Sequence, residues 1–320
     1  MTAIPAESAA PRGVDGVVVV DKPAGPTSFD VVRRLRRFGR DRKAGHTGTL
    51  DPMATGVLPI CLGDATKIAS FITDGDKEYE GVVALGVETD TYDATGTVVA
   101  EARAEGLERE RVEDAVAAMA GVYWQTPPMF SAVKVQGRRL YELARKGEEI
   151  ERRPRKVRIE RIELRAWDPG AARATIFVRC GKGTYVRSIA HELGVALGVG
   201  GHLASLRRLR SGPFGIERAV PLAALLEGGL EAVRGSLVPL RDALPELREI
   251  VLDEARTRKV AHGMSLGGRD LAECRAPRLA PGERVRLTDA SGRLLAVAEA
   301  DAGALRYLRV LAAAGARGGV

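Results

Sequence analysis

The sequence predicts an α+β protein with a large first domain and a small β-rich domain at its end. Up to about residue 246, short β-branched runs such as 17–20 are interspersed with segments of helical apolar spacing such as 107–119. From about residue 247, strand-like runs separated by Gly and Asp turns predominate. A chain of 320 residues is long enough for two domains.

The first elements follow from local chemistry. Residues 17–20 are four valines and predict a buried strand, which the breaker-rich stretch 21–26 ends. Ser28 is the expected N-cap of a following helix. The apolar face of that helix would hold Phe29, Val32, Leu35 and Phe38, and arginines would occupy its other face.

The later elements are assigned in the same way. Strands are expected at 80–86, 97–100 and 173–179, and helices at 107–119 and 185–197, the second capped by Thr184. A boundary is expected at 239–249, followed by strands at 285–288, 294–299 and 305–310. Residues 1–13 are expected to be a disordered tail rather than a signal peptide.

The charge balance favours a polyanionic partner. The formal net charge is +7, and residues 134–161 alone hold eleven Lys and Arg against five Glu, a net of +6. Such a block is either a solvated surface or a surface that binds phosphates and releases their counterions.

Several classes of protein are disfavoured by the cysteines, histidines and glycines. The three cysteines are far apart and predict no disulfide framework, which favours a reducing, cytoplasmic setting. The four histidines lack zinc spacing. The stretch 178–188 lacks the first glycine of a phosphate loop, and 198–201 lacks the acid that follows a dinucleotide-binding turn. No apolar run approaches the roughly 20 residues of a membrane span.

The densest motif surrounds one acid, Asp51. It lies in the stretch 43–59, KAGHTGTLDPMATGVLP, where glycines and prolines predict a tight loop. On local grounds an Asp-Pro acid is most often a turn residue. The alternative is a catalytic carboxylate presented by the loop.

Three other residues have a structural and a functional interpretation. Arg187 is either a surface charge or the cation that keeps a buried carboxylate ionised. Tyr79, at a strand start, is either a packing residue or a platform on which an extruded base stacks. Leu206, within 201–212, belongs either to an amphipathic segment or to the wall of a base-binding pocket.

Together these motifs resemble the TruB family of tRNA pseudouridine synthases. The matching stretches are 16–30, 43–62, 77–97, 125–147, 180–188 and 202–212, and the resemblance covers about residues 14–215. It implies a catalytic domain at 14–246 with a central mixed, mainly antiparallel sheet flanked by helices. It also implies an RNA-gripping insertion at about 125–155 and a PUA-like RNA-binding domain at 247–320.

The resemblance implies a role for each matching residue. Asp51 would be the catalytic carboxylate, held ionised by Arg187, and would act at C1′ or C6 of the nucleotide or on the proton at C2′. Tyr79 would stack on the flipped base and assist proton removal from C5. The residues expected to bind substrate are His46, Lys22, Tyr185 and Leu206. For Lys22, which lies in the Asp-Lys-Pro loop, the alternatives are a structural role and a contact with phosphate.

The implied reaction converts uridine 55 of the tRNA T loop to pseudouridine. It requires no cofactor and no metal, because no redox change or group transfer occurs. The expected partner is the T stem-loop of tRNA, without a guide RNA, and the expected state is a monomer. Competing hypotheses are an RNA chaperone without chemistry, which could coexist with the enzyme, an aspartyl-phosphate phosphotransferase and a guide-dependent synthase.

Overall fold

The computed structural model describes residues 13–131, 134–135, 138–140 and 150–311. The expected tail at 1–13 therefore lies outside the described residues except for Gly13. Much of the insertion expected at 125–155, and of the basic block at 134–161, lies outside them too. Those two predictions are not tested by the fold.

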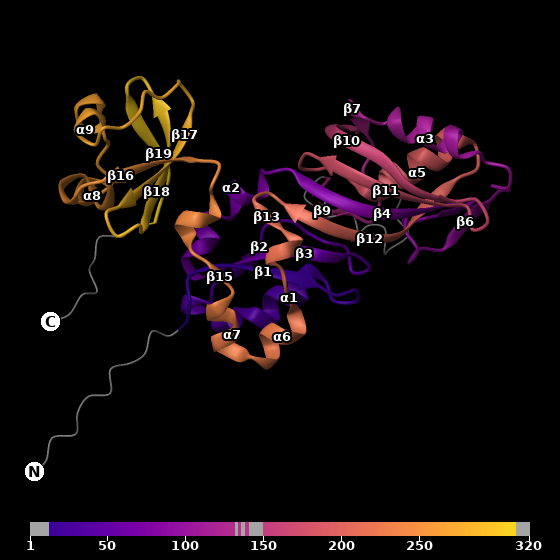
Figure 1. Ribbon diagram of the computed structural model, residues 1–320, viewed down its shortest axis with the longest axis horizontal. Helices are drawn as coiled ribbons and strands as arrows, with labels where there is room; N and C mark the ends of the chain where they lie inside the picture. The colour runs from indigo at the N-terminus through magenta and orange to yellow at the C-terminus, as the bar shows by residue number, and fades with distance from the viewer. Residues whose placement is uncertain (1–12, 132–133, 136–137, 141–149, 312–320) are drawn as a thin grey trace, which may run out of the picture.

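A large sheet runs through the first domain (Figure 1). Its main path has the order β14-β1-β3-β12-β4-β11-β10-β7, with β13, β15 and β2 attached at its side. The strands of the path are β14 (Val220–Pro221), β1 (Gly16–Lys22), β3 (Thr55–Leu62), β12 (Gly201–Ser211), β4 (Lys77–Leu85), β11 (Arg173–Cys180), β10 (Arg155–Asp168) and β7 (Gly121–Gln125). The attached strands are β13 (Phe214–Gly215), β15 (Leu237–Val238) and β2 (Ala44–His46).

The pairing confirms a mixed, mainly antiparallel sheet. Parallel pairing occurs between β1 and β14 and between β3 and β12, and the other described pairs of this sheet are antiparallel. The helices of this domain are α1 (Ser28–Leu35), α2 (Ala69–Thr73), α3 (Arg109–Ala117), α5 (Val186–Leu197), α6 (Leu222–Glu227) and α7 (Gly229–Gly235). Short 3-10 turns occur at Arg36–Phe38, Arg40–Arg42, Gly63–Lys67, Ile216–Arg218 and Leu240–Ala243.

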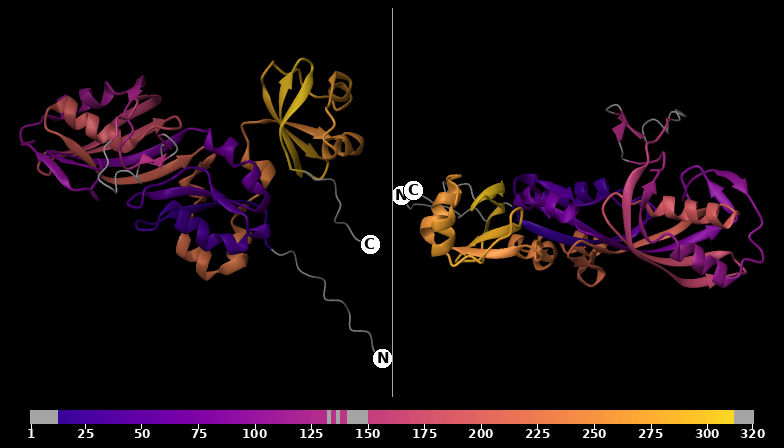
Figure 2. Two further views of the ribbon diagram at one scale, coloured as in Figure 1. Left: turned by 180° about the vertical axis from the view of Figure 1, so that it is seen from behind. Right: turned by 90° about the horizontal axis from the view of Figure 1, so that it is seen from above.

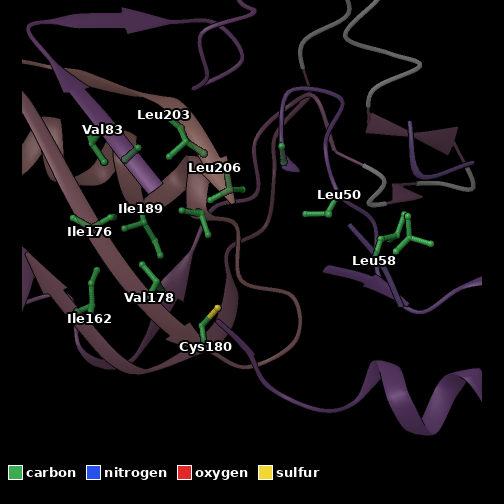
Figure 3. Close-up of a cluster of buried hydrophobic side chains, with 14 of the residues drawn as sticks. Leu50, Leu58, Val83, Ile162, Ile176, Val178, Cys180, Ile189, Leu203 and Leu206 are labelled. Atoms are coloured by element: carbon green, nitrogen blue, oxygen red, sulfur yellow. The ribbon is translucent and has the colours of Figure 1, made fainter. Parts of the chain in front are cut away.

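Helices α3 and α5 cover one face of the β4, β11 and β10 half of the sheet (Figure 1). Between them lies a core in which Ile176, Val178, Ile189 and Leu203 are fully or almost fully buried (Figure 3). Truncation of such side chains to alanine typically costs about 2–5 kcal/mol. This packing fixes α5, and therefore Arg187, relative to the sheet.

Helix α1 begins at Ser28, one residue earlier than the sequence predicted. Its N-cap is Thr27, which forms a capping box with Asp30, and Ser28 is already helical and buried. The helix buries Val31, Val32 and Leu35, whereas Phe29 is 69% exposed. The predicted cap at Ser28 and the buried position of Phe29 are therefore wrong, whereas Val32, Leu35 and Phe38 of the predicted apolar face are buried.

The strand expected at 97–100 is β6 (Val98–Glu101), which pairs with the short β5 (Val87–Thr89). One further local prediction needs correction. Helix α5 is capped at Tyr185 without a side-chain hydrogen bond, because Thr184 donates its hydroxyl to the carbonyl of Gly181 instead. A hairpin of β8 (Lys134–Val135) and β9 (Arg138–Arg139) projects away from the sheet (Figure 2).

The β-rich C-terminal unit has a four-stranded sheet of its own. It consists of β16 (Arg248–Leu252), β17 (Arg284–Asp289), β18 (Leu294–Asp301) and β19 (Ala304–Val310), with α8 (Glu254–Ala261) and α9 (Gly268–Glu273) beside it (Figure 2). Leu294, Val297 and Leu311 share a buried cluster with Val17 and Val57 of the first domain. The unit is therefore docked by apolar contacts, and its expected RNA-binding role stays a prediction.

Candidate active site

Asp51 lies in the loop between β2 and β3, and this loop is tied to α1. The hydroxyl of Ser28 donates to the carbonyl of Leu50 at 3.0 Å and accepts from the Leu50 N–H at 2.8 Å. The N–H of Gly25 donates to the carbonyl of Pro52 at 2.8 Å. Hydrogen bonds on both sides of Asp51 therefore fix the backbone that presents its carboxylate.

Lys22 supports the same loop from the interior. Its ammonium donates to the carbonyls of Pro23, Pro26 and Pro52 at 2.8, 2.9 and 3.2 Å, and its side chain is fully buried. Burial lowers the pKa of Lys22 to about 8, although the nearby Asp51 opposes this shift. The three donors of the ammonium are thus directed at protein carbonyls, and a contact with substrate would require the loop to move.

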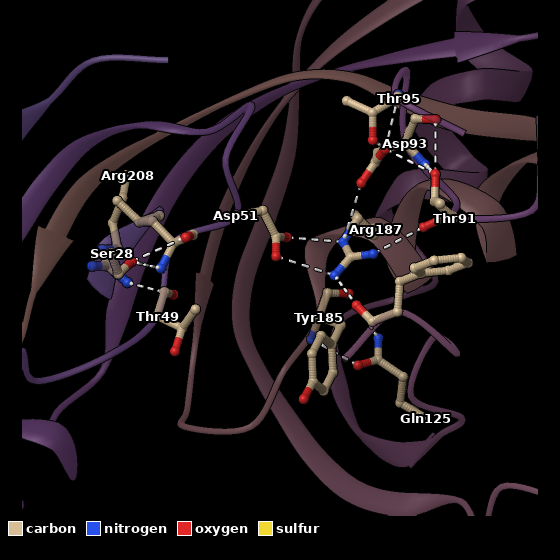
Figure 4. A network of polar contacts seen from close by, with 12 residues as sticks. Ser28, Thr49, Asp51, Thr91, Asp93, Thr95, Gln125, Tyr185, Arg187 and Arg208 are labelled. Atoms are coloured by element: carbon tan, nitrogen blue, oxygen red, sulfur yellow. Dashed lines mark hydrogen bonds and ion pairs between the residues drawn. The ribbon is translucent and has the colours of Figure 1, made fainter. Parts of the chain in front are cut away.

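Arg187, on α5, contacts Asp51, as the family resemblance implied (Figure 4). Its Nη2 donates to Asp51 Oδ1 at 3.2 Å, and its Nε lies 2.9 Å from Asp51 Oδ2. The guanidinium also donates to the carbonyls of Thr91 and Phe130 at 3.0 and 2.8 Å. The Arg187 side chain is 4% exposed and that of Asp51 is 33% exposed. The pair therefore joins an anchored cation to a carboxylate that remains accessible.

A second carboxylate, Asp93, shares the guanidinium of Arg187, and the sequence analysis assigned it no role. Its Oδ2 lies 3.6 Å from Arg187 Nε. Its Oδ1 accepts from the hydroxyls of Thr91 and Thr95 at 2.8 and 2.6 Å and from the Thr95 N–H at 2.9 Å. The signal that could have revealed this turn is the dense Thr and Asp pattern at 89–95, which is typical of side chains that bond their own backbone.

Tyr185 is held at the start of α5 by Gln125, another residue that the sequence analysis did not single out. Gln125 accepts from the Tyr185 N–H at 2.8 Å and donates to its carbonyl at 3.2 Å. Gln125 also donates to the hydroxyl of Tyr123 at 2.9 Å, and that hydroxyl donates to Glu192 at 2.8 Å. This chain of hydrogen bonds connects β7 to the cap of α5.

Tyr79 and Leu206 lie on the neighbouring strands β4 and β12. Tyr79 is half-buried against the core and faces Val178 and Arg208 in the strand register. Burial raises the pKa of the Tyr79 phenol, while the charge of Arg208 opposes this shift. Leu206 is 8% exposed and packs in the same core cluster. The Asp51 charge acts on the pKa of both Tyr79 and Tyr185, so the two phenols lie within its electrostatic reach.

His46 is the last residue of β2, just before the Asp51 loop. Its Nδ1 accepts from the N–H of Gly48 at 3.3 Å. Burial and the charge of Arg208 lower the pKa of His46 below its ordinary value. The structure therefore brings Asp51 and Arg187 into direct contact, with Tyr185 at the cap of α5 two residues before Arg187 and His46 at the start of the Asp51 loop.

No cluster of three or more His, Cys, Asp or Glu side chains with metal-binding geometry occurs among the described residues. In the same part of the chain, no helix is long and apolar enough to cross a membrane. A separate hollow of about 380 Å³ is lined by Lys156, Arg158 and Lys182 together with Asp74 and Asp76. Two of its cations pair with its acids, and it contains none of the predicted site residues.

Comparison with known proteins defines the class of this site. Residues 36–186 match the model of the TruB family pseudouridylate synthase N-terminal domain, and residues 187–252 match the tRNA pseudouridylate synthase B C-terminal domain. The first match contains Asp51, Tyr79 and Tyr185, and Arg187 is the first residue of the second. The sheet, the Asp51–Arg187 pair and these matches define a pseudouridine synthase, an enzyme that isomerises uridine in RNA.

Similar proteins place the chain more narrowly. A Saccharophagus degradans protein named tRNA pseudouridine synthase B is 42% identical over 294 residues, which are 90% of this chain and 92% of that protein. A protein of the same name from Symbiobacterium thermophilum is 48% identical over 81% of this chain and 86% of its own length. The chain belongs to the TruB family.

The fold also matches a solved structure. A chain in the crystal structure of a Cbf5-Nop10-Gar1 complex superposes with a TM-score of 0.69 at 26% sequence identity. The match covers 92% of this chain and 84% of that chain. The predicted fold class is confirmed by this likeness and by the strand pairing.

Proposed function

We propose that this enzyme isomerises a uridine in the T loop of tRNA, at the position conventionally numbered 55, and that Asp51 is its catalytic carboxylate. The observation that carries the proposal is the Asp51–Arg187 pair, in which one accessible carboxylate is held by one buried guanidinium. The tRNA substrate is supported by the names of relatives that match 81–90% of this chain.

The reaction breaks the N1–C1′ bond, rotates the base and forms a C5–C1′ bond. The C5 proton leaves to solvent and N1 gains a proton, so the formula of the nucleotide is unchanged. One carboxylate beside the sugar and base is sufficient, acting as a nucleophile at C1′ or C6 or as a base at C2′. Each route uses an oxygen of Asp51, and the Arg187 guanidinium holds that carboxylate in place.

The other site residues have roles that fit this chemistry. A stacked uridine is out of reach, so it must be flipped from the loop at a cost of a few kcal/mol. The half-buried ring of Tyr79 offers a stacking surface for the flipped base. Tyr185 and Leu206 would line the base pocket, and His46 would enter the space that the base leaves. We propose Lys22 as a support of the loop rather than as a phosphate contact.

Tritium release tests this function. The purified protein is incubated with a tRNA transcript labelled with tritium at uridine C5, in EDTA and without any guide RNA. We expect release from the wild type and none from Asp51→Asn, whereas Asp114→Asn on the exposed face of α3 should equal the wild type. No release from the wild type would refute the enzymatic proposal, and equal release from Asp51→Asn would refute the role of Asp51.

Independence from a guide RNA is tested in the same assay. We propose a stand-alone enzyme because the relatives named above carry only tRNA in their name, whereas the similar fold in the Cbf5-Nop10-Gar1 crystal structure is part of a complex. Release from free tRNA by the lone protein would establish the stand-alone mode. A requirement for added RNA or protein would contradict it.

A further inference from the structure

Arg208 is a fully buried arginine beside the proposed base pocket. It lies on β12 and is 1% exposed. Its Nε donates to the carbonyl of Val57 at 2.7 Å, its Nη2 to that of Gly48 at 3.1 Å and its Nη1 to that of Thr49 at 3.4 Å. One guanidinium therefore binds three backbone carbonyls that belong to one segment of the chain.

These carbonyls lie on both sides of Asp51. Gly48 and Thr49 belong to the loop before it, and Val57 lies on β3, which begins soon after it. The guanidinium thus bridges the start of the Asp51 loop and the strand into which the loop continues. A neutral side chain with one donor could not hold all three carbonyls in this way.

The backbone of Arg208 also lies against β3, the strand that follows the Asp51 loop. Arg208 pairs with Gly56 in the parallel register of β12 and β3. Gly56 has φ +98°, and a Cβ at this position would lie 2.2 Å from the carbonyl oxygen of Arg208. The approach of the two strands is therefore possible only with glycine at position 56, and it places the root of the Asp51 loop directly against Arg208.

The charge of Arg208 has no carboxylate partner within the part of the chain that the structure describes. The preceding residue, Arg207, by contrast donates to Asp21 at 2.8 Å. Burying an uncompensated cation costs free energy, so we expect this buried charge to have a functional role. The charge lowers the pKa of His46 and opposes the effect of burial on Tyr79, so it acts on two of the proposed site residues.

We propose that Arg208 is a positioning residue for Asp51, fixing the loop so that the carboxylate faces the substrate and Arg187. The proposal rests on the catalytic role of Asp51 proposed above. Arg208 touches no reacting atom, and it acts through the carbonyls of Gly48, Thr49 and Val57. A displacement of about 1 Å of a catalytic group can cost about 100-fold in rate, which is the scale expected if these three hydrogen bonds are lost.

The test compares chemistry with binding. Arg208→Met and Arg208→Lys are assayed for single-turnover tritium release at saturating enzyme, and for tRNA affinity by filter binding. We expect the rate to fall by about 100-fold for methionine and by less for lysine, with the dissociation constant changed by less than about threefold. A merely structural role would lower the amount of folded enzyme without changing the rate of the folded fraction.

The control is Val260→Ala, which removes buried volume from α8 in the separate core cluster of the C-terminal unit. Its thermal unfolding should be shifted without a change in single-turnover rate. Full rates in whichever Arg208 variants fold would overturn the proposal, as would equal losses of rate in the control. Failure of the proposed function is distinguishable, because it would appear as inactive wild type or active Asp51→Asn.

A second readout is chemical rescue. Arg208→Ala leaves a cavity of guanidinium shape, and added ethylguanidinium should restore part of the single-turnover rate, whereas ethylammonium should restore less. Faster amide hydrogen exchange at residues 48–54 is expected in the unrescued variant. Exchange equal to that of the wild type, with no effect of ethylguanidinium, would contradict the proposed positioning role of Arg208.

Discussion

Replacing Arg187 with methionine tests the buried charge arrangement of the site. The substitution keeps the length of the side chain but removes the ion pair with Asp51 and the contact with Asp93. It also removes the donors to the carbonyls of Thr91 and Phe130. Because Arg187 is 4% exposed, water cannot replace these contacts without opening the structure.

The expected loss of stability comes mainly from Asp93. Asp51 has a side chain that is 33% exposed, so water can solvate it once the pair is broken. Asp93 is only 6% exposed and would keep a buried charge without its cation. Removing one partner of a buried pair typically costs about 3–5 kcal/mol. Since Asp93 retains its bonds from Thr91 and Thr95, we expect a value near the lower limit, about 3 kcal/mol.

The measurement is a set of urea and thermal unfolding curves. For a chain of this size, about 3 kcal/mol corresponds to a fall in Tm of roughly 6–12 °C. Adding Asp93→Asn to Arg187→Met removes the stranded charge and should recover part of the loss, without restoring tritium release. A Tm unchanged in Arg187→Met, or losses that simply add in the double variant, would refute this account.

Three further predictions follow from other parts of the structure. Gly56→Ala should abolish stable folding or shift β3, because its Cβ would meet the Arg208 carbonyl, and a circular dichroism melt like the wild type would contradict this. Burial raises the pKa of Glu192 above its ordinary 4.5, so the folded state holds this proton more tightly than the unfolded state. Wild-type stability should therefore fall as pH rises from about 4.5 through the raised pKa, and urea titrations of Glu192→Gln should lack this fall. Raising salt above about 0.1 M should weaken tRNA binding steeply in filter assays, and a flat response would show that the basic segments do not contact phosphates.

Local patterns in the sequence were sufficient for most elements. The valine run gave β1, and the apolar spacing of Val112 and Val116 gave α3, because both signals depend on neighbouring residues alone. The prediction of Ser28 as a helix cap failed because the partner of its hydroxyl is distant in the sequence. The hydroxyl of Ser28 bonds Leu50, which is 22 residues away, and a local capping rule contains no information about such a partner.

The predicted site was incomplete in the same way. Asp51 and Arg187, 136 residues apart, were joined by the family resemblance and not by any local signal. Gln125 and Arg208 bond backbone groups of distant segments, and Asp93 lies beside the distant guanidinium of Arg187. All three residue types are common in loops and on surfaces. Their roles become visible only when the fold shows which carbonyls and N–H groups they meet.

The unequal anchoring of Asp51 and Arg187 has a consequence for the proposed mechanism. Arg187 is held by Asp93 and by two carbonyls besides Asp51, so its orientation does not depend on the catalytic pair. Asp51 is more exposed, and Arg187 is the one cation of the described residues within ion-pair distance of it. A carboxylate that leaves its partner to bond a sugar or base carbon therefore leaves behind a guanidinium that is already oriented. Such preorganised charge needs no rearrangement when the carboxylate returns, which favours release of the product.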